Sequence, residues 1–406
     1  MENNKPELLA PAGNLVMLRT ALDSGADAVY FGIKSFNMRT RARNFELNQL
    51  RNIVRTCHDS GARAYLALNI IIYDDELDTL DGVIREARQA GVDAVICWDM
   101  SVIQACKRHY QVFHVSTQAS VSNFDAARFY YELGAARIVL ARECTLDQIR
   151  GIKNKIQEHN LGLELEAFVH GAMCVSVSGR CFMSQFVYNK SANRGECIQN
   201  CRREYIVKDS ETDAELTVGS NYVLSPRDLS TIMFIDELMD VGIDSFKIEG
   251  RARSEEYVKT VVSAYRKAVD ACSENKFDKK LKDSLNSELE TVYNRGFSSG
   301  FYMGRSLSAW TDDYGSMATR KKIYLGKVEN YFAKASAFEM RVVSNSFTLD
   351  DEIMVQGPTT GVVQDKPISI QSYGEDREQA GKNDHIGVKF SAKVRRNDKV
   401  FKIVDA

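Results

Sequence analysis

Four of the nine cysteines in this chain fall within one short segment, at Cys174, Cys181, Cys197 and Cys201. Glycines punctuate the segment, which has neither helical nor strand periodicity, as is typical of a loop that folds back on itself. Four thiolates gathered by such a loop can ligate a tetrahedral metal ion or an iron–sulfur cluster. A lone cysteine is more often a small buried apolar residue, but four in so short a run favour metal ligation.

The composition is that of a folded protein with more than one structural unit. Apolar residues make up 44% of the 406 residues and only five residues are proline, which excludes a disordered chain. The N-terminal residues do not resemble a signal sequence, and no apolar run approaches the roughly 20 residues of a membrane span. We therefore expect a cytoplasmic protein with no membrane segment, in which cysteines serve metal ligation rather than disulfides. A net charge of −2 excludes a global attraction to nucleic acid, so RNA binding would require local basic patches.

A glycine followed by a short apolar segment recurs along the chain, at Gly25, Gly61, Gly91, Gly134 and Gly242. This pattern is typical of a helix that ends at glycine and is followed by a buried strand. With three further apolar segments it predicts about eight strands that alternate with helices. Such an α/β chain favours a parallel sheet closed into a TIM-like (β/α)8 barrel with a cysteine-rich insertion, and the open doubly wound sheet is the alternative.

The pattern divides the chain into three parts. We predict that the barrel spans residues 1–275, with the cysteine-rich loop at 171–221 inserted into it. A charged helical linker is expected over 276–321. Short alternating strands separated by Gly, Asn and Asp then predict a small C-terminal antiparallel β-barrel domain over 322–406.

Barrel enzymes place their chemistry at the carboxyl ends of the strands, so polar residues at those positions are candidates. The candidates for catalysis are Glu166, His170, Lys247 and Glu249. Those for substrate binding are Asn69, Gln118 and Arg142, and Asp99, Ser116, Glu143 and Arg251 also follow predicted strands. Charged residues at loop starts are often only solvated, so the barrel rule supports the group more than any one member.

Two groups of arginines are expected at the same end of the barrel. Guanidinium groups bind phosphates and carboxylates bidentately, so both groups suit anion binding, although an ordinary basic surface loop has the same composition. The first group follows the second predicted strand and contains Arg39, Arg41 and Arg43. The second borders the cysteines and contains Arg194, Arg202 and Arg203.

Several common catalytic motifs are absent. The sequence has no G-x-G-x-x-G and no P-loop motif, which argues against dinucleotide and P-loop nucleotide sites. It has no H-E-x-x-H, which argues against a zinc peptidase. A protease would need Ser178 or Cys181 as a nucleophile beside His170.

Motifs along nearly the whole chain resemble the peptidase U32 family. They are LLAPAGN from Leu8, STQ from Ser116, LARE from Leu140, the HGAMC…SGRC…C pattern from His170, and FKIEGRARSEEYV from Phe246. Members of this family have been described as collagenase-like proteases. Better-understood members look like oxygen-independent hydroxylases that carry a 4Fe-4S cluster and act on tRNA uridine, ribosomal RNA cytidine or a ubiquinone precursor.

The resemblance implies a ligand set for the cluster. Cys174, Cys181 and Cys197 match the family's ligands, and the C-x3-C ending shared with tRNA-type members makes Cys201 the fourth. Ubiquinone-pathway members take the fourth ligand from further downstream, where this chain offers only Cys272. Zinc remains the alternative metal for four thiolates.

The resemblance also implies an activity. It predicts prephenate-dependent C5 hydroxylation of the tRNA wobble uridine, with tRNA and a small-molecule hydroxyl donor as partners. Arg39, Arg41 and Arg43 would hold the carboxylates of prephenate or the phosphates of the tRNA. The alternatives are a U32-type peptidase, or a hydroxylase acting on ribosomal RNA or a ubiquinone precursor.

Overall fold

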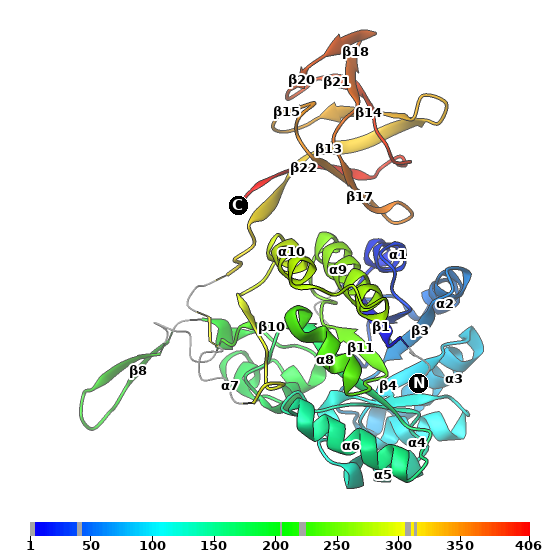
Figure 1. The fold of residues 1–406 in the computed structure, drawn as a ribbon, viewed down its shortest axis with the longest axis vertical. Helices are drawn as coiled ribbons and strands as arrows, with labels where there is room; N and C mark the ends of the chain where they lie inside the picture. The colour runs from blue at the N-terminus through cyan, green and yellow to red at the C-terminus, as the bar shows by residue number, and fades with distance from the viewer. Residues whose placement is uncertain (1–4, 39–42, 204, 219–224, 305–309, 312–314) are drawn as a thin grey trace.

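The computed structural model describes residues 5–38, 43–203, 205–218, 225–304, 310–311 and 315–406. Its larger part is a closed barrel of parallel strands (Figure 1). Each strand pairs with the next along the chain, and the last pairs with both its predecessor and the first, which excludes an open sheet. The strands are β1 (Glu7–Ala12), β2 (Ala28–Phe31), β3 (Arg63–Ala67), β4 (Ala94–Cys97), β5 (Phe113–Val115), β6 (Arg137–Val139), β7 (Glu164–Gly171) and β11 (Ser245–Ile248). The predicted TIM-like barrel is therefore confirmed.

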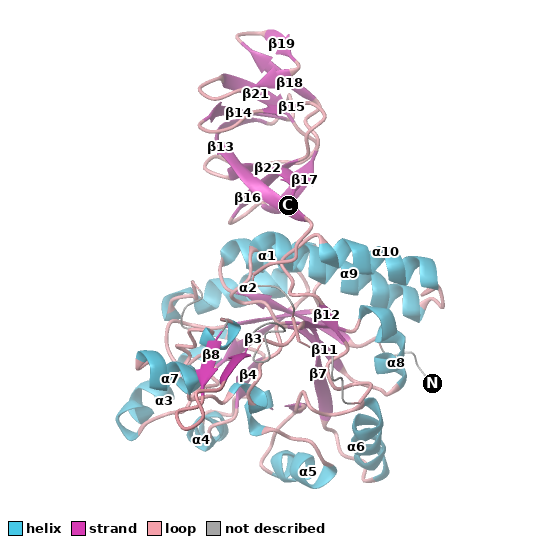
Figure 2. Ribbon diagram, turned by 90° about the vertical axis from the view of Figure 1, so that its left-hand side faces the viewer, coloured by secondary structure: helices cyan, strands magenta, loops and turns pink. Residues whose placement is uncertain are grey.

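Helices cover the outside of the barrel (Figure 2). Several begin at the polar N-cap residues that the backbone requires, such as Asn14, whose side chain accepts a hydrogen bond from the Met17 amide. Gly91 ends one of them in the left-handed conformation, which explains the glycine of the sequence repeat. The helices are α1 (Leu15–Asp23), α2 (Leu50–Asp59), α3 (Leu77–Ala90), α4 (Met100–Arg108), α5 (Phe124–Glu132), α6 (Leu146–Glu158), α8 (Ile235–Asp240), α9 (Glu255–Ser273) and α10 (Lys279–Glu290).

The cysteine-rich segment is inserted between β7 and β11. It contains one short helix, α7 (Met183–Tyr188), and a hairpin of β8 (Tyr205–Lys208) and β9 (Glu215–Val218) that projects away from the barrel (Figure 1). It then returns through β10 (Asp228–Ser230), which pairs antiparallel with the end of β7. Further along the chain, β12 (Phe297–Ser298) adds to β10. The insertion therefore begins and ends at the carboxyl end of β7.

The C-terminal part is antiparallel β structure, as expected, and stacks on α1 and α9 (Figure 1). Its core contains the fully buried rings of Phe338, Phe347 and Phe390. Glu256 at the start of α9 fixes it by accepting hydrogen bonds from Lys322 at 2.7 Å and Gln356 at 3.2 Å. The strands are β13 (Arg320–Phe332), β14 (Ala337–Val342), β15 (Phe347–Thr348), β16 (Ile353–Gly357), β17 (Gly361–Asp365), β18 (Ser369–Ser372), β19 (Glu375–Arg377), β20 (Gln379–Ala380), β21 (His385–Lys389) and β22 (Lys399–Asp405).

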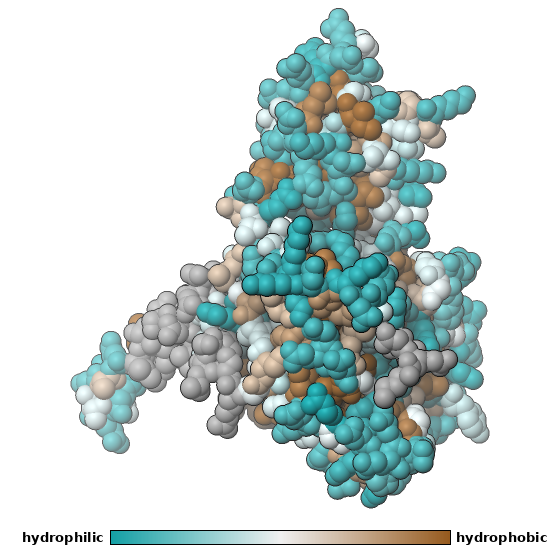
Figure 3. All heavy atoms as spheres, viewed as in Figure 1, coloured by the Kyte–Doolittle hydropathy of each residue, from teal (hydrophilic) through white to brown (hydrophobic). Residues whose placement is uncertain are grey.

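The outer surface in view is mostly hydrophilic over both the barrel helices and the C-terminal strands (Figure 3). Within the described ranges, no helix combines the length and the apolar composition that crossing a membrane would need. The charged faces of the amphipathic helices therefore point to solvent, as the sequence pattern predicts.

Gly171 is the point at which β7 ends and the insertion begins. Its φ of +110° lies in the region that favours glycine. A Cβ atom there would lie 2.6 Å from the backbone oxygen of Glu249, just beyond β11. The close approach of the two chain segments at the barrel rim therefore requires glycine.

We predict that Gly171→Ala lowers the free energy of unfolding by about 1–3 kcal/mol, because it adds both backbone strain and a clash with the Glu249 carbonyl. Gly151→Ala is the matched control, since Gly151 lies within α6 and no atom would contact its Cβ. It should stabilise the protein by up to ~1 kcal/mol through helix propensity. Urea unfolding followed by helical circular dichroism measures both, and equal midpoints for the two variants would refute the requirement for glycine at the rim.

Candidate functional site

A cavity of about 440 Å³ lies at the carboxyl ends of the barrel strands, a volume within the range of small-ligand sites. Strand-end residues form one side of the cavity and the cysteine-rich insertion forms the other. The predicted catalytic and substrate-binding residues that line it are Asn69, Gln118, Arg142, Lys247 and Glu249. The predicted metal ligands that line it are Cys174, Cys197 and Cys201.

The other predicted residues lie elsewhere. Glu166 is fully buried beneath the cavity, and Cys181 is partly buried in the insertion. Arg43 is exposed and does not line the cavity. Arg39 and Arg41 fall outside the described residues, so the expected arginine site stays a prediction.

His170 does not face the cavity, because β7 contains a bulge. Lys247 on β11 pairs with Phe168, but the next residue, Ile248, pairs with His170, so β7 has one extra residue at this point. A bulge of one residue turns the following side chains to the opposite face. His170 therefore points outward, packs beside Tyr257 and Tyr265 of α9, and is not placed for the proton transfer expected of it. Burial lowers its pKa to about 3, so the imidazole stays neutral.

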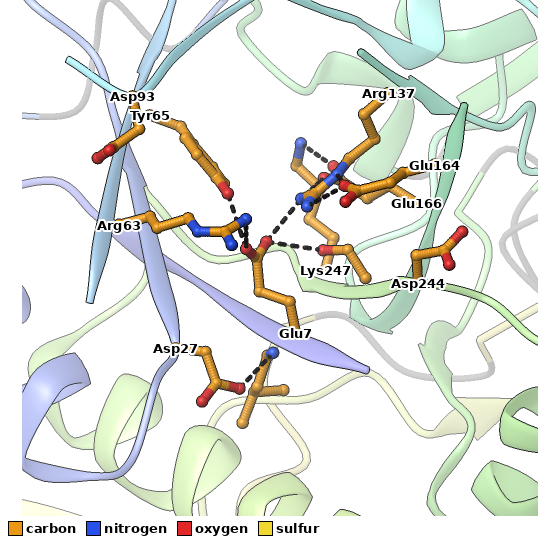
Figure 4. Close-up of polar contacts among 12 residues, drawn as sticks. Glu7, Asp27, Arg63, Tyr65, Asp93, Arg137, Glu164, Glu166, Asp244 and Lys247 are labelled. Carbon is orange, nitrogen blue, oxygen red and sulfur yellow. Dashed lines mark hydrogen bonds and ion pairs between the residues drawn. The ribbon is translucent and has the colours of Figure 1, made fainter. Parts of the chain in front are cut away.

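Lys247 is the cation at the floor of the cavity, and a chain of buried ion pairs continues beneath it (Figure 4). Its Nζ atom lies 2.7 Å from Oε1 of Glu166, and Oε2 of Glu166 lies 3.2 Å from Nη1 of Arg137. Arg137 is only 1% exposed. The three side chains come from β11, β7 and β6, so the floor depends on three strands that are far apart in sequence.

Arg137 also links this chain to the amino end of the barrel. Its Nη1 atom lies 2.6 Å from Glu7 on β1, and its Nη2 atom lies 2.6 Å from Glu164 on β7. Glu7 in turn accepts a hydrogen bond from the hydroxyl of Tyr65 on β3 at 2.7 Å (Figure 4). Burial alone would lower the pKa of Arg137, but Glu166 and Glu7 raise it above its ordinary value. The guanidinium therefore stays charged inside the barrel.

Lys247 is surrounded by both a carboxylate and aromatic rings. Burial lowers its pKa, and the carboxylate of Glu166 opposes that shift. The rings of Tyr30 and Phe168 also lie 4.8 Å and 5.4 Å from its Nζ atom. A lysine held in this way can bind an anion or donate a proton to a group in the cavity.

Two arginines fasten the insertion over the cavity. Arg142 stacks 3.9 Å from the centre of the Phe168 ring and donates a hydrogen bond of 2.7 Å to the carbonyl of Ala172. Arg202 donates to the carbonyls of Met173 and Pro226. Both guanidiniums thus bind backbone carbonyls within two residues of Cys174. The arginines therefore help to position that cysteine and also add positive charge to the cavity.

Arg194 fixes the outer side of the insertion. It forms an ion pair with Glu76, with Nη1 and Oε2 at 2.7 Å, and its guanidinium lies 4.7 Å from the Tyr73 ring. Its charge is therefore used to attach the insertion to the loop after β3. Of the predicted second arginine group, Arg202 lines the cavity, together with Arg142 and Lys247.

The four clustered cysteines lie near one another. Burial raises the pKa of Cys201, Arg202 opposes the shift, and the neighbouring thiols of Cys174, Cys197 and Cys181 raise it further. Backbone amides donate hydrogen bonds to two of the sulfurs, from Ser176 to Cys174 at 3.4 Å and from Met183 to Cys181 at 3.3 Å. Such amide–sulfur contacts stabilise a thiolate.

The geometry stops short of a formed metal site. Among the described residues, no three His, Cys, Asp or Glu side chains are arranged closely enough to hold a metal ion. Cys272, the alternative fourth ligand, lies on α9 packed against the barrel core, and burial raises its pKa to about 12. The groups that shift its pKa are Asp236, Lys282 and Asp240, and not the clustered thiols. The ligand set from the sequence therefore stays a prediction, with Cys201 better placed than Cys272.

Arg137 is the main residue that the sequence reasoning missed. It lies in the apolar segment that forms β6, where a charged residue should not be buried without a partner. Its partners Glu164 and Glu166 alternate along β7, so they share one face of that strand. An arginine in one buried strand and two alternating glutamates in the next were the available signal.

We predict that Arg137→Met lowers the free energy of unfolding by roughly 3–5 kcal/mol, because it leaves the Glu166 and Glu7 carboxylates buried near each other without a guanidinium. Arg150→Met is the matched control, since Arg150 forms an exposed ion pair with Asp147 on α6. Such surface pairs contribute about 0–1 kcal/mol. Urea unfolding at neutral pH compares the two variants, and similar midpoints would show that the buried network adds no stability.

Comparison with known proteins places this chain among relatives of two kinds. It is 41% identical to a Porphyromonas gingivalis protein named "Collagenase", over 99% of each chain. It is 35% identical to the Bacillus subtilis "tRNA hydroxylation protein P1", over 87% of this chain and 84% of the other. It is also 35% identical to a 23S rRNA 5-hydroxycytidine synthase of Escherichia coli, over 75% of this chain and 46% of the other. The model of peptidase family U32 matches residues 13–312, and the chain belongs to that family.

Proposed function

We propose that this protein is an RNA-modifying hydroxylase, and specifically that it hydroxylates C5 of the tRNA wobble uridine with prephenate as co-substrate. The proposal draws on relatives whose names state RNA hydroxylation. Its main structural support is a cavity with Lys247 and Arg142 on one side and three clustered cysteines on the other. Lys247 and Arg142 would attract an acid, and the cysteine thiolates would ligate a redox group. Both would then act in the same small-molecule site.

The chemistry of the four thiols fits an iron–sulfur cluster. Cys174, Cys181, Cys197 and Cys201 would hold a 4Fe-4S cluster, which transfers single electrons when bound. The amides that already donate to Cys174 and Cys181 would stabilise the bound thiolates. Zinc fits the same donors, so the identity of the metal is part of the proposal.

The residues of the cavity divide between the two substrates. The ammonium of Lys247 and the guanidinium of Arg142 would bind the carboxylates of the co-substrate. The side-chain amides of Asn69 and Gln118 line the same cavity and carry both donors and acceptors, which suit the edge of an extruded base. Glu166 and Arg137 would act as positioning residues, because they contact Lys247 directly or through one ion pair and do not reach the cavity surface.

The names of other relatives support a peptidase as the competing function. The site argues against it, because the buried His170 points away from the cavity and stays neutral. The residues Gly296–Gly300 match the G-x-S-x-G pattern of hydrolases. However, Ser298 lies in the two-residue strand β12, which pairs with β10, and not on the strand-to-helix turn that such a nucleophile requires.

Nucleoside mass spectrometry of tRNA tests the function. A deletion strain without a second copy of the enzyme should lose nucleosides derived from 5-hydroxyuridine, and the wild-type gene should restore them. Lys247→Met should restore them at a rate roughly 100-fold lower, since it removes the cation that binds the acid. Lys280→Met, on the exposed face of α10, is the charge-matched control and should restore them fully.

Two results would overturn this proposal. One is a deletion strain whose tRNA keeps all of its 5-hydroxyuridine-derived nucleosides. The other is casein or collagen cleavage by the purified protein that is lost in the Lys247→Met variant, which would assign the cavity to a peptidase.

A further inference from the structure

The insertion that borders the cavity exposes a group of large apolar side chains. Phe182 is 65% exposed and Phe186 is 86% exposed, and their ring centroids lie 6.4 Å apart. Tyr188 at the end of the same short helix is 38% exposed. Exposed rings that contact each other, as Phe182 and Phe186 do, point to an interaction site more strongly than single exposed apolar residues. We call the three rings, Phe182, Phe186 and Tyr188, the α7 platform.

The α7 platform is attached firmly to the segment that lines the cavity. Ser184, on the inner side of α7, is buried and donates a hydrogen bond of 3.1 Å to Asn200, and its hydroxyl accepts one of 3.0 Å from the Ile198 amide. Ile198 lies in the cavity wall between Cys197 and Cys201. A ligand on the platform would therefore lie beside the cavity, at a position fixed relative to it.

Two arginines lie close to the platform: Arg203 contacts Tyr188, and Arg180 precedes Phe182 by two residues. The guanidinium of Arg203 lies 5.5 Å from the Tyr188 ring and donates to its hydroxyl. Arg180 lies 5.7 Å from the ring of Trp98 and donates to Ser120 at 3.3 Å. In the described part of the chain, neither of these two guanidiniums pairs with a carboxylate. Both charges therefore remain available to an anion.

The charge of this segment differs from that of the whole protein. Residues 171–203 contain five basic residues and one acidic residue, whereas the whole chain has a net charge of −2. Protein interfaces are also enriched in aromatic residues and arginine, so it is the excess of basic residues that favours an anionic partner. Aromatic faces beside arginines that lack carboxylate partners are typical of surfaces that stack the bases of single-stranded nucleic acid and contact its phosphates.

We propose that the α7 platform binds the unpaired loop of the RNA substrate. Phe182, Phe186 and Tyr188 stack bases next to the nucleotide that enters the cavity, and Arg180 and Arg203 contact the adjoining phosphates. The assignment of the cavity to a nucleotide rests on the proposed function. The platform adds a docking surface outside the cavity and a reason for preferring an unpaired loop over a duplex, because paired bases do not offer free faces for stacking.

Binding of a short RNA stem-loop to the full-length protein tests this proposal, with a fully paired RNA of the same length as the reference. The double variant Phe182→Ala/Phe186→Ala should bind the stem-loop roughly tenfold more weakly per stacked base and lose its preference over the duplex. Phe182→Tyr/Phe186→Tyr should retain both. Tyr110→Ala is the control, because Tyr110 is 85% exposed but precedes β5, at the end of the barrel opposite the cavity.

The arginines have a separate signature. Arg180→Gln/Arg203→Gln should weaken binding of both RNAs and lower the dependence of log Kd on log salt by about 0.7 for each phosphate that the variant no longer neutralises. The proposal is overturned if the double Phe variant binds and modifies RNA as the wild type does. It is also overturned if that variant changes only self-association or protein binding.

If the proposed hydroxylase function is wrong but the platform does bind RNA, the experiments give a different result. In that case the deletion strain keeps its modified nucleosides, while the wild-type protein still prefers the stem-loop and loses this preference with the two phenylalanines. That result would retain the platform as an RNA-binding surface and remove the hydroxylase assignment.

Discussion

The burial of Arg137 among carboxylates from three directions is the interaction on which the barrel interior depends. Parallel barrels usually fill this space with branched apolar side chains. Here the guanidinium contacts Glu7, Glu164 and Glu166, and the last of these holds Lys247 at the floor of the cavity. Isolated charges are unstable in such an interior, so burial of Arg137, Glu166 and Lys247 depends on their pairing with one another. Closure of the sheet and the charge of the site are therefore coupled.

The two sides of the cavity are held in place by different interactions. The barrel side is rigid, because ion pairs across β6, β7 and β11 hold its cation in place. The described residues of the insertion contribute little to the hydrophobic core, and arginines such as Arg142 and Arg202 fix the segment by donating to its backbone. A rigid floor that orients a small acid and a fastened loop that carries thiols suit a reaction between a bound anion and a redox group.

The barrel was predictable from the sequence, because most helices between its strands end beside a glycine that precedes a buried strand, and that signal is local. The cavity residues Asn69, Gln118 and Lys247 were predictable for the same reason, since the barrel rule converts position along a strand into position in space. The orientation of His170 was not, because a one-residue bulge leaves no mark on the hydrophobic pattern. The contact of Arg137 with Glu7 joins segments that are distant in sequence, and the exposure of the rings around α7 depends on the tertiary fold, so periodicity reports neither.

The central claim is that the four cysteines beside the charged cavity hold an iron–sulfur cluster, and an absorption spectrum with iron analysis of the anaerobically purified protein tests it most directly. We predict a brown protein with broad absorption near ~400 nm. Cys201→Ser should lose colour and iron, because a cluster short of one thiolate becomes labile, whereas Cys272→Ser should keep both. A colourless protein that contains zinc, or a Cys201→Ser variant with full iron beside a bleached Cys272→Ser variant, would contradict it.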